Sequence, residues 1–384
     1  MKVKTEIVTL FDKTKPFQLE SGSELSPVQV AYQTYGKLNS EGTNAILICH
    51  ALTGNAHAAG ILAEEEYDIR SNPDLLNKYS ILNKGKPGWW DELIGEGKLF
   101  DTNKYFVISS NILGSCYGTT GPVSIKNIFN RSYGMNFPTV TVRDMVKLQK
   151  TLIEHLNVNK LATVAGGSLG GMQVLEWAIL YPEIVNSIIP IATSAQHSPW
   201  AISLNEASRH AIKNDPKWMN GNYKTQPYDG LALARKIAMI SYRSMESFEQ
   251  KFSRERKDEN SSKLDTENIF QIESYLNHHG DKLNQRFDAN TYLYLSHAMD
   301  LHDVALNRGS LDEILGSIKV PSLSVGISSD ILYPPDEQKK IASMIPDGEY
   351  AELNSLHGHD GFLIEFDQMT EIIGKFLSHN NLIR

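Results

Sequence analysis

The feature that most constrains the fold of this chain is a series of short, almost wholly apolar segments. They lie at residues 44–49, 105–108, 161–165, 185–191 and 320–325. Such runs are typical of strands that are covered on both faces, as in a parallel sheet. Amphipathic patterns at 141–153 and 169–180 predict helices, and Thr141 with Asp144 forms a capping-box pattern at the start of the first. The alternation predicts an α/β fold with a mostly parallel sheet and helices on both faces.

Residues 197–312 interrupt this alternation, because they show helical patterns without a clear strand. The patterns cover residues 201–212, 231–252, 269–276 and 290–301. After them the last apolar run, at 320–325, and a predicted helix at about 363–377 continue the alternation of strands and helices. We therefore expect one core domain made of residues 1–196 and 313–384, with a helical lid domain of residues 197–312 inserted between two strands of its sheet.

Composition excludes several functional classes. The 384 residues include 45 Asp and Glu against 37 Lys and Arg, and the net charge of −8 supplies no basic surface for nucleic acid. The two cysteines, Cys49 and Cys116, are too few for a disulfide scaffold or a cysteine-rich zinc module. No segment approaches the ~20 apolar residues that cross a bilayer, and the first residues lack the apolar core of a signal peptide. We expect a soluble cytoplasmic protein with no nucleic-acid partner, no membrane partner and no metal.

A short glycine-rich motif indicates the chemistry. Residues 166–170, GGSLG, match the pattern G-x-S-x-G and lie directly between a predicted strand and a predicted helix. This is the context of a nucleophile elbow, in which a strained turn lifts the serine hydroxyl clear of the sheet. Ser168 is then the candidate nucleophile, and the N–H of Leu169 is a candidate donor to an oxyanion. A glycine-rich phosphate loop or a plain strand-to-helix turn is the alternative.

A serine hydroxyl needs a base to take its proton, and in this arrangement the acid and the histidine follow the serine in sequence. Asp330 follows the fifth apolar run, whereas its competitor Asp336 lies in a helix-start pattern. His359 lies after the next predicted strand, and we prefer it to His357. The predicted catalytic triad is therefore Ser168, Asp330 and His359.

A second oxyanion donor is expected on the loop after the strand at 44–49. The N–H of Leu52 is the candidate, because Leu52 lies in the short sequence HALTG that follows this strand. His50 opens the same loop, and we interpret it as a residue that shapes the loop rather than as the catalytic base.

Several longer blocks resemble the homoserine O-acetyltransferase family. They occur in order along nearly the whole chain, and those around residues 50–60 and 110–122 are far more specific than the serine motif. The blocks are HALTGNAHAAG at 50–60, GWWD at 88–91, DT at 101–102, SNILGSCYGTTGP at 110–122, GGSLGGMQ at 166–173 and GHDGFL at 358–363.

The resemblance implies an α/β-hydrolase fold with a helical lid and a homodimer. It implies transfer of the acetyl group of acetyl-CoA, a co-substrate rather than a bound cofactor, to the hydroxyl of L-homoserine, the first committed step of methionine synthesis. The same triad carries over, Ser168 with Asp330 and His359. Arg235 and Asp360 carry over as contacts to the amino-acid substrate, with Arg243 as an alternative to Arg235.

Two positions depart from the family pattern: Leu169 stands where Met is often found, and Gly361 where Ala is often found. Neither touches a triad atom. Because relatives use succinyl-CoA or accept serine, an O-succinyltransferase acting on homoserine or serine is an alternative function. A serine esterase is a second, since both chemistries pass through an acyl-serine. A non-catalytic binding protein of the same fold would usually have lost one of the three triad residues.

Overall fold

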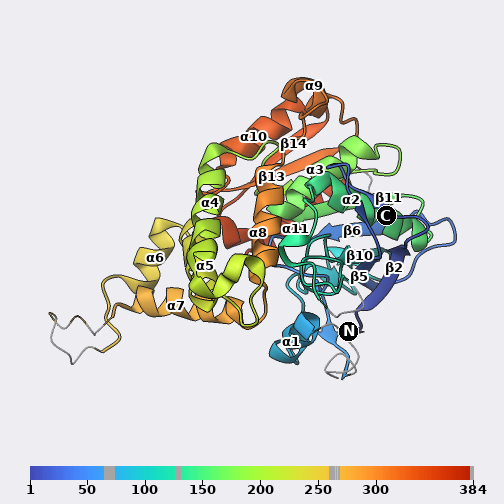
Figure 1. Cartoon of the computed structure of the whole chain (residues 1–384). Helices are drawn as coiled ribbons and strands as arrows, with labels where there is room; N and C mark the ends of the chain where they lie inside the picture. The colour runs from blue at the N-terminus through green and yellow to red at the C-terminus, as the bar shows by residue number, and fades with distance from the viewer. Residues whose placement is uncertain (65–73, 127–130, 259–263, 265, 267–268, 381–384) are drawn as a thin grey trace.

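The computed structural model describes residues 1–64, 74–126, 131–258, 264, 266 and 269–380, and within them one large sheet organises the chain (Figure 1). Its eight strands are, from one edge to the other, β14 (Gly348–Leu353), β13 (Ser322–Ile327), β12 (Ile188–Ile191), β11 (Leu161–Gly167), β6 (Ala45–Cys49), β10 (Phe106–Ser110), β5 (Val28–Tyr35) and β2 (Glu6–Phe11). Each strand from β14 to β10 pairs in parallel with its neighbour. The strand β5 pairs antiparallel with both β10 and β2. The predicted mostly parallel sheet is confirmed.

The sheet is covered on both faces, which explains why its strands are almost wholly apolar. Along β6, Ile46 and Ile48 pack into a layer that contains α11 (Phe366–His379). The alternate residues of β6, Cys49 among them, pack into the opposite layer with α2 (Val142–His155), α3 (Leu169–Leu180) and α10 (Pro335–Met344). A strand buried on both sides has no solvent-facing positions for polar residues.

The remaining elements are short or lie between β12 and β13. Before β12 they are α1 (Asp74–Leu82), the 3₁₀ helix η2 (Gly134–Asn136) and the two-residue strands β1 (Lys2–Val3), β3 (Phe17–Gln18), β4 (Glu24–Leu25), β7 (Ile61–Leu62), β8 (Ile94–Gly95) and β9 (Phe100–Asp101). After β12 they are α4 (Pro199–Asn214), the 3₁₀ helix η3 (Pro216–Gly221), α5 (Tyr228–Tyr242), α6 (Met245–Phe252), α7 (Gln271–Asn284), α8 (Ala289–Asp300) and α9 (Leu311–Gly316). A further 3₁₀ helix, η4 (Gly358–Leu363), precedes α11. No helix within the described ranges is both long and apolar enough to cross a membrane.

The helical segment differs from its prediction in two places, one of which is α7, which continues eight residues beyond the expected end at 276. The single helix expected at 231–252 is two helices, because Arg243 adopts extended backbone angles and ends α5. Ser244 then caps α6 by accepting a hydrogen bond from the backbone N–H of Ser247. The helices α4 to α7 gather to one side of the sheet (Figure 1), and α5 packs between α4 and α7. Their action as a lid domain stays a prediction.

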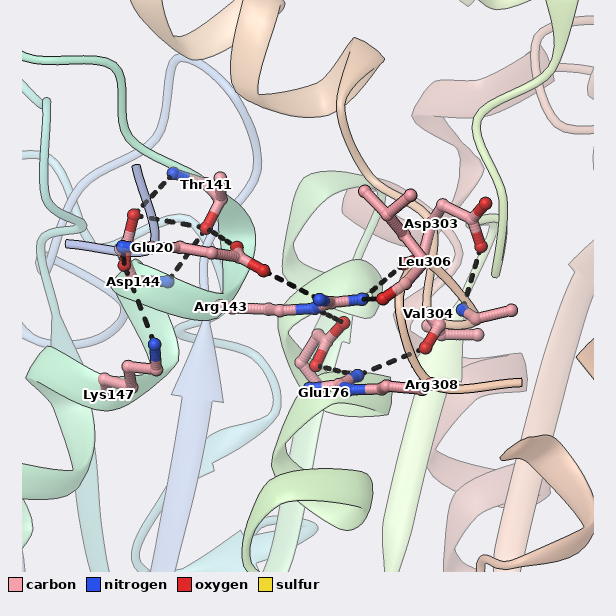
Figure 2. A network of polar contacts seen from close by, with 11 residues as sticks. Glu20, Thr141, Arg143, Asp144, Lys147, Glu176, Asp303, Val304, Leu306 and Arg308 are labelled. Carbon is pink, nitrogen blue, oxygen red and sulfur yellow. Dashed lines mark hydrogen bonds and ion pairs between the residues drawn. The ribbon is translucent and has the colours of Figure 1, made fainter. Parts of the chain in front are cut away.

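The predicted capping box at the start of α2 is present. The side-chain hydroxyl of Thr141 accepts from the backbone N–H of Asp144 at 3.2 Å, and the carboxylate of Asp144 accepts from the backbone N–H of Thr141 at 3.1 Å. Figure 2 shows this pair beside a larger group of charged residues. The N-terminal segment joins here too, since the backbone N–H of Glu20 donates to Asp144 at 2.8 Å.

A buried ion-pair network ties α2 and α3 to the segment that leads out of the helical region (Figure 2). The carboxylate of Glu176 on α3 is 1% exposed and bridges Arg143 at 3.1 Å and Arg308 at 2.8 Å. Arg143 also pairs with Glu20 at 2.7 Å, and it donates to the backbone carbonyl of Asp303 at 2.7 Å. The network therefore fixes the end of residues 197–312 against the core.

Replacing the shared carboxylate should destabilise the protein strongly. In Glu176→Gln the guanidinium groups of Arg143, which is buried, and of Arg308, which is partly buried, lose their common anion. Breaking a buried pair in this way costs about 3–5 kcal/mol. The measurement is the free energy of unfolding from urea denaturation. Glu371→Gln is the matched control, because Glu371 pairs with Lys375 on the surface of α11 and exposed pairs contribute at most about 1 kcal/mol. A Glu176→Gln variant as stable as this control would contradict the role of the network.

Candidate active site

Ser168 lies in the turn between β11 and α3 in a backbone conformation that few side-chain-bearing residues adopt. Its φ is 59° and its ψ is −125°, a strained combination that costs on the order of 1–3 kcal/mol. The flanking glycines are required by close approach. A Cβ atom on Gly166 would lie 2.5 Å from the carbonyl oxygen of Cys49, and one on Gly170 would lie 2.2 Å from it. The turn therefore has the geometry of the predicted elbow.

Asp330 and His359, far apart in sequence, meet in a hydrogen bond. The Nδ1 atom of His359 lies 2.7 Å from Oδ2 of Asp330, and both residues are 3% exposed. The other carboxylate oxygen of Asp330 accepts from the backbone N–H groups of Leu332 at 2.8 Å and Tyr333 at 3.0 Å. These bonds fix the carboxylate, so the imidazole holds its proton on Nδ1 and leaves Nε2 free to act as a base.

Aromatic rings surround the His359 imidazole on several sides. The ring centroids of Tyr242, Tyr333 and Phe362 lie 5.5, 5.3 and 5.6 Å from that of His359. The Phe362 ring also fills the space beside Gly167, where an added Cβ would lie 2.5 Å from it. Phe362 thus packs against both the serine turn and the histidine loop. Among the described residues no hydrogen bond joins Ser168 to His359, as is common before substrate binds.

Sequence reasoning did not single out Tyr242, Tyr333 or Phe362 as parts of the site. Phe362 lies in the block GHDGFL that supported the family resemblance, and Tyr333 follows Asp330 by three residues. Tyr242 ends α5, more than a hundred residues before His359, and no local pattern connects the two. Only the packing of α5 against η4 brings them together.

Asp336 and His357, the alternatives to Asp330 and His359 in the triad, have other partners. The carboxylate of Asp336 is 91% exposed in the first turn of α10 and pairs with Lys339 at 3.3 Å, as expected for a helix-start residue. His357 lies near the guanidinium of Arg243, at 3.4 Å from Nη1, and the structure places it beside no carboxylate among the described residues.

The two candidate oxyanion donors are free to bind a ligand. Neither the N–H of Leu52 nor that of Leu169 donates a hydrogen bond within the described part of the chain. The Gln173 side chain connects their two segments, because its amide donates to the carbonyl of Leu169 at 3.1 Å and to that of His50 at 3.4 Å. The loop after β6 is thereby held against the start of α3.

His50 is built into this loop. Its ring is 1% exposed, and Nδ1 lies 2.8 Å from the carbonyl oxygen of the next residue, Ala51. Burial lowers the pKa of His50 to about 4, so the ring is neutral at pH 7. It has no carboxylate partner among the described residues, unlike His359.

The three residues considered for substrate recognition lie along the C-terminal half of α5 and on η4. Arg235 lies over the ring of Tyr242, with its guanidinium carbon 5.6 Å from the ring centroid. Arg243 instead forms an ion pair with Asp360, with Nε 3.2 Å from Oδ2, and both side chains are 20% exposed. Arg235 therefore keeps its guanidinium available, whereas Arg243 already has a carboxylate partner.

A cavity of about 760 Å³ is lined in part by Arg235. One wall is the loop after β6, including His50 and Thr53, and another contains Arg235 and Phe362. In the described ranges no group of three or more His, Cys, Asp or Glu side chains could hold a metal ion. Phe362 lines this cavity and packs against the ring of His359, so the cavity adjoins the candidate triad. A strained serine, a carboxylate-bound histidine and two free N–H groups are suited to acyl transfer.

Comparison with known proteins matches this geometry. The family model described as the alpha/beta hydrolase fold matches residues 44–365. The homoserine O-acetyltransferase of Deferribacter desulfuricans is 49% identical over 382 residues, covering 98% of this chain and 96% of its own. That of Moorella thermoacetica is 48% identical and covers 96% and 95%. The chain belongs to the homoserine O-acetyltransferase family. The predicted α/β-hydrolase fold and the family resemblance are both confirmed.

Solved structures place this homoserine O-acetyltransferase family member among both transferases and esterases. The homoserine O-acetyltransferase of Bacillus anthracis superimposes with a TM-score of 0.85 at 29% identity, over 98% of each chain. An esterase superimposes equally well, with a TM-score of 0.85 at 29% identity over 98% of this chain and 100% of its own. The shared fold therefore does not separate transfer from hydrolysis.

The buried ring of His50 should make stability fall as the pH falls. Its folded pKa of about 4 lies below the ordinary value of 6.5. Between these two pH values the imidazole is therefore protonated in the unfolded chain but not in the folded chain. Between about pH 6.5 and 4 this one group contributes a slope of up to about 1.4 kcal/mol per pH unit. In His50→Gln the free energy of unfolding, measured by urea denaturation at several pH values, should depend less steeply on pH. Parallel profiles for the two proteins would contradict this assignment.

Proposed function

We propose that this chain transfers the acetyl group of acetyl-CoA to the hydroxyl of L-homoserine, giving O-acetyl-L-homoserine and CoA in methionine biosynthesis. The observation that carries the proposal is identity near 48% with homoserine O-acetyltransferases along almost the whole chain. The hydrogen-bonded Asp330 and His359 and the strained Ser168 supply the machinery. We also propose a cytoplasmic homodimer, on the family resemblance.

The first half-reaction acylates the enzyme. The Ser168 hydroxyl attacks the thioester carbonyl as Nε2 of His359 takes its proton, and the Asp330 carboxylate stabilises the imidazolium that results. The oxyanion of the tetrahedral intermediate lies between the N–H groups of Leu52 and Leu169, and each such donor lowers the barrier by about 2.7–4 kcal/mol. The carbon–sulfur bond then breaks, His359 returns the proton to sulfur, and CoA leaves an acetyl-serine.

The second half-reaction repeats the same steps with a different nucleophile. The homoserine hydroxyl attacks the acetyl-serine while His359 takes its proton, and the bond from the acetyl carbon to Ser168 breaks. His359 then returns the proton to the serine oxygen. Because one group serves both halves through a covalent intermediate, we expect ping-pong kinetics.

Transfer requires that homoserine reach the acetyl-serine before water does. The helical segment supports this, because α5 packs directly against η4, the turn that contains His359. A covered site also lets the bound acceptor act at a high effective concentration, up to roughly 10⁵–10⁸ M in favourable cases. Covering the site and positioning the acceptor are therefore the functions we assign to residues 197–312.

Homoserine offers a carboxylate and an ammonium group for recognition. We assign the carboxylate to Arg235, whose guanidinium faces the cavity and can bind it through two parallel hydrogen bonds. We assign the ammonium to Asp360, next to His359 in sequence. The ion pair of Asp360 with Arg243 orients the carboxylate and leaves its second oxygen for the substrate.

The decisive experiment incubates the protein with acetyl-CoA, with and without L-homoserine, and follows free CoA. We expect release to depend on homoserine and O-acetyl-L-homoserine to accumulate in equal amount. Ser168→Ala should lower turnover by about 10⁴-fold or more. Equal release without an acceptor would instead support the esterase function that the similarity to a solved esterase suggests. Replacing the donor by succinyl-CoA, or the acceptor by serine, tests the remaining alternatives.

The choice between the two arginines is testable by kinetics. Arg235→Leu should raise the KM for homoserine by roughly tenfold to a hundredfold, because a charged hydrogen-bonded contact contributes about 1.5–3 kcal/mol. The KM for homoserine methyl ester, which lacks the carboxylate charge, should change much less. Arg243→Leu is the comparison variant. If Arg243→Leu shows the selective loss and Arg235→Leu does not, the assignment of the carboxylate passes to Arg243.

A further inference from the structure

Four cationic side chains line the cavity beside the candidate site, more than homoserine recognition requires. They come from different elements: Lys86 follows α1, Arg235 lies on α5, Lys282 lies on α7, and Arg286 follows α7. Among the described residues of the lining the one carboxylate is that of Asp281, and it accepts a hydrogen bond of 2.6 Å from the hydroxyl of Tyr228. The cavity is therefore positively charged, although the whole chain has a net charge of −8.

These cations have no anionic partners in the described residues. No ion pair there includes Lys86, Arg235, Lys282 or Arg286. The pKa of Lys282 is lowered by burial and by the nearby charges of Arg286, Lys86 and Arg235. Like charges held close together without counter-ions destabilise a folded protein, so a group of this kind indicates an anionic ligand.

Two of the four cations already have other roles. Arg235 is assigned above to the homoserine carboxylate. Arg286 holds the loop after β6, which contains Leu52, because its Nη1 donates to the carbonyl of Thr53 at 2.8 Å and to the hydroxyl of Tyr117 at 2.7 Å. Lys86 and Lys282 remain. Both are exposed, and the one hydrogen bond of the Lys86 ammonium among the described residues goes to the backbone carbonyl of Leu82, at 3.1 Å.

We propose that Lys86 and Lys282 bind the phosphate groups of the acyl donor. This rests on the proposed function, in which the donor is acetyl-CoA, a thioester linked by a pantetheine arm to a diphosphate and a 3′-phosphate. The acetyl end would lie near Thr53 and Phe362, which line the same cavity. The arm would extend toward Lys86 and Lys282, whose flexible ammonium groups serve as point charges for phosphate.

The test compares two donors that share the same thioester and pantetheine arm. S-acetylpantetheine lacks the nucleotide and all three phosphates. In the double variant Lys86→Gln with Lys282→Gln, the ratio of kcat/KM for acetyl-CoA to kcat/KM for S-acetylpantetheine should fall about 25-fold, taking about fivefold for each exposed charge contact. A residue needed only for folding would lower both values together and leave the ratio unchanged. Lys375→Gln, on α11 and outside the cavity, is the matched control and should keep the wild-type ratio.

A binding measurement separates this inference from the proposed function. In a Ser168→Ala background no acylation occurs, so calorimetry can give the dissociation constant of CoA directly. We expect CoA to bind about 25-fold more weakly when both lysines are replaced, and the wild-type affinity to fall as salt is raised. If this loss is found but homoserine is not acetylated, the phosphate site stands and the proposed function fails. If transfer occurs but neither the ratio nor the dissociation constant changes, the inference is overturned and the function stands.

Discussion

The candidate site depends on one close contact, the backbone of the turn between β11 and α3 lying against the end of β6. Gly166 and Gly170 both lie so near the carbonyl oxygen of Cys49 that a side chain at either position would collide with it. Ser168 lies between these glycines in its strained conformation, and Gln173 of α3 donates a hydrogen bond to His50 in the loop that contains Leu52. The proposed nucleophile and the candidate oxyanion donors therefore lie on segments that pack directly against each other.

The proposed base, His359, and its carboxylate partner, Asp330, come from the loops after the two strands at one end of the sheet. Asp330 follows β13 and His359 follows β14, two adjacent parallel strands, so their loops meet where the strands end. Burial strengthens the hydrogen bond between them, because little water competes for either partner. Aromatic rings then pack around the imidazole, and one of them, Phe362, also packs beside Gly167 in the serine turn. In this way the core positions the proposed triad, while the segment between β12 and β13 supplies three of the four cations in the cavity, Arg235, Lys282 and Arg286.

Much of this could be predicted from local patterns. The apolar runs predicted β6, β11 and β13, the elbow motif predicted Ser168 and its flanking glycines, and the order of parallel strands predicted where Asp330 and His359 should lie. The helix boundaries within residues 197–312 were harder to predict. An amphipathic pattern continues across Arg243, although the helix ends there and the segment forms α5 and α6. Hydrophobic periodicity reports which face of a helix is buried, and it does not report where tertiary contacts end that helix.

By itself the sequence determined the fold class, the elbow turn around Ser168 and membership in a family, because each of these follows from residues that are close together or from blocks in a fixed order. The tertiary structure alone decided which distant side chains share the cavity. It separated Arg235 from Arg243 through the ion pair of Arg243 with Asp360, and it brought Lys86 and Lys282 into one cavity. Such contacts depend on how α5, α7 and the loop after α1 pack in space, and no periodicity or spacing along the chain records that.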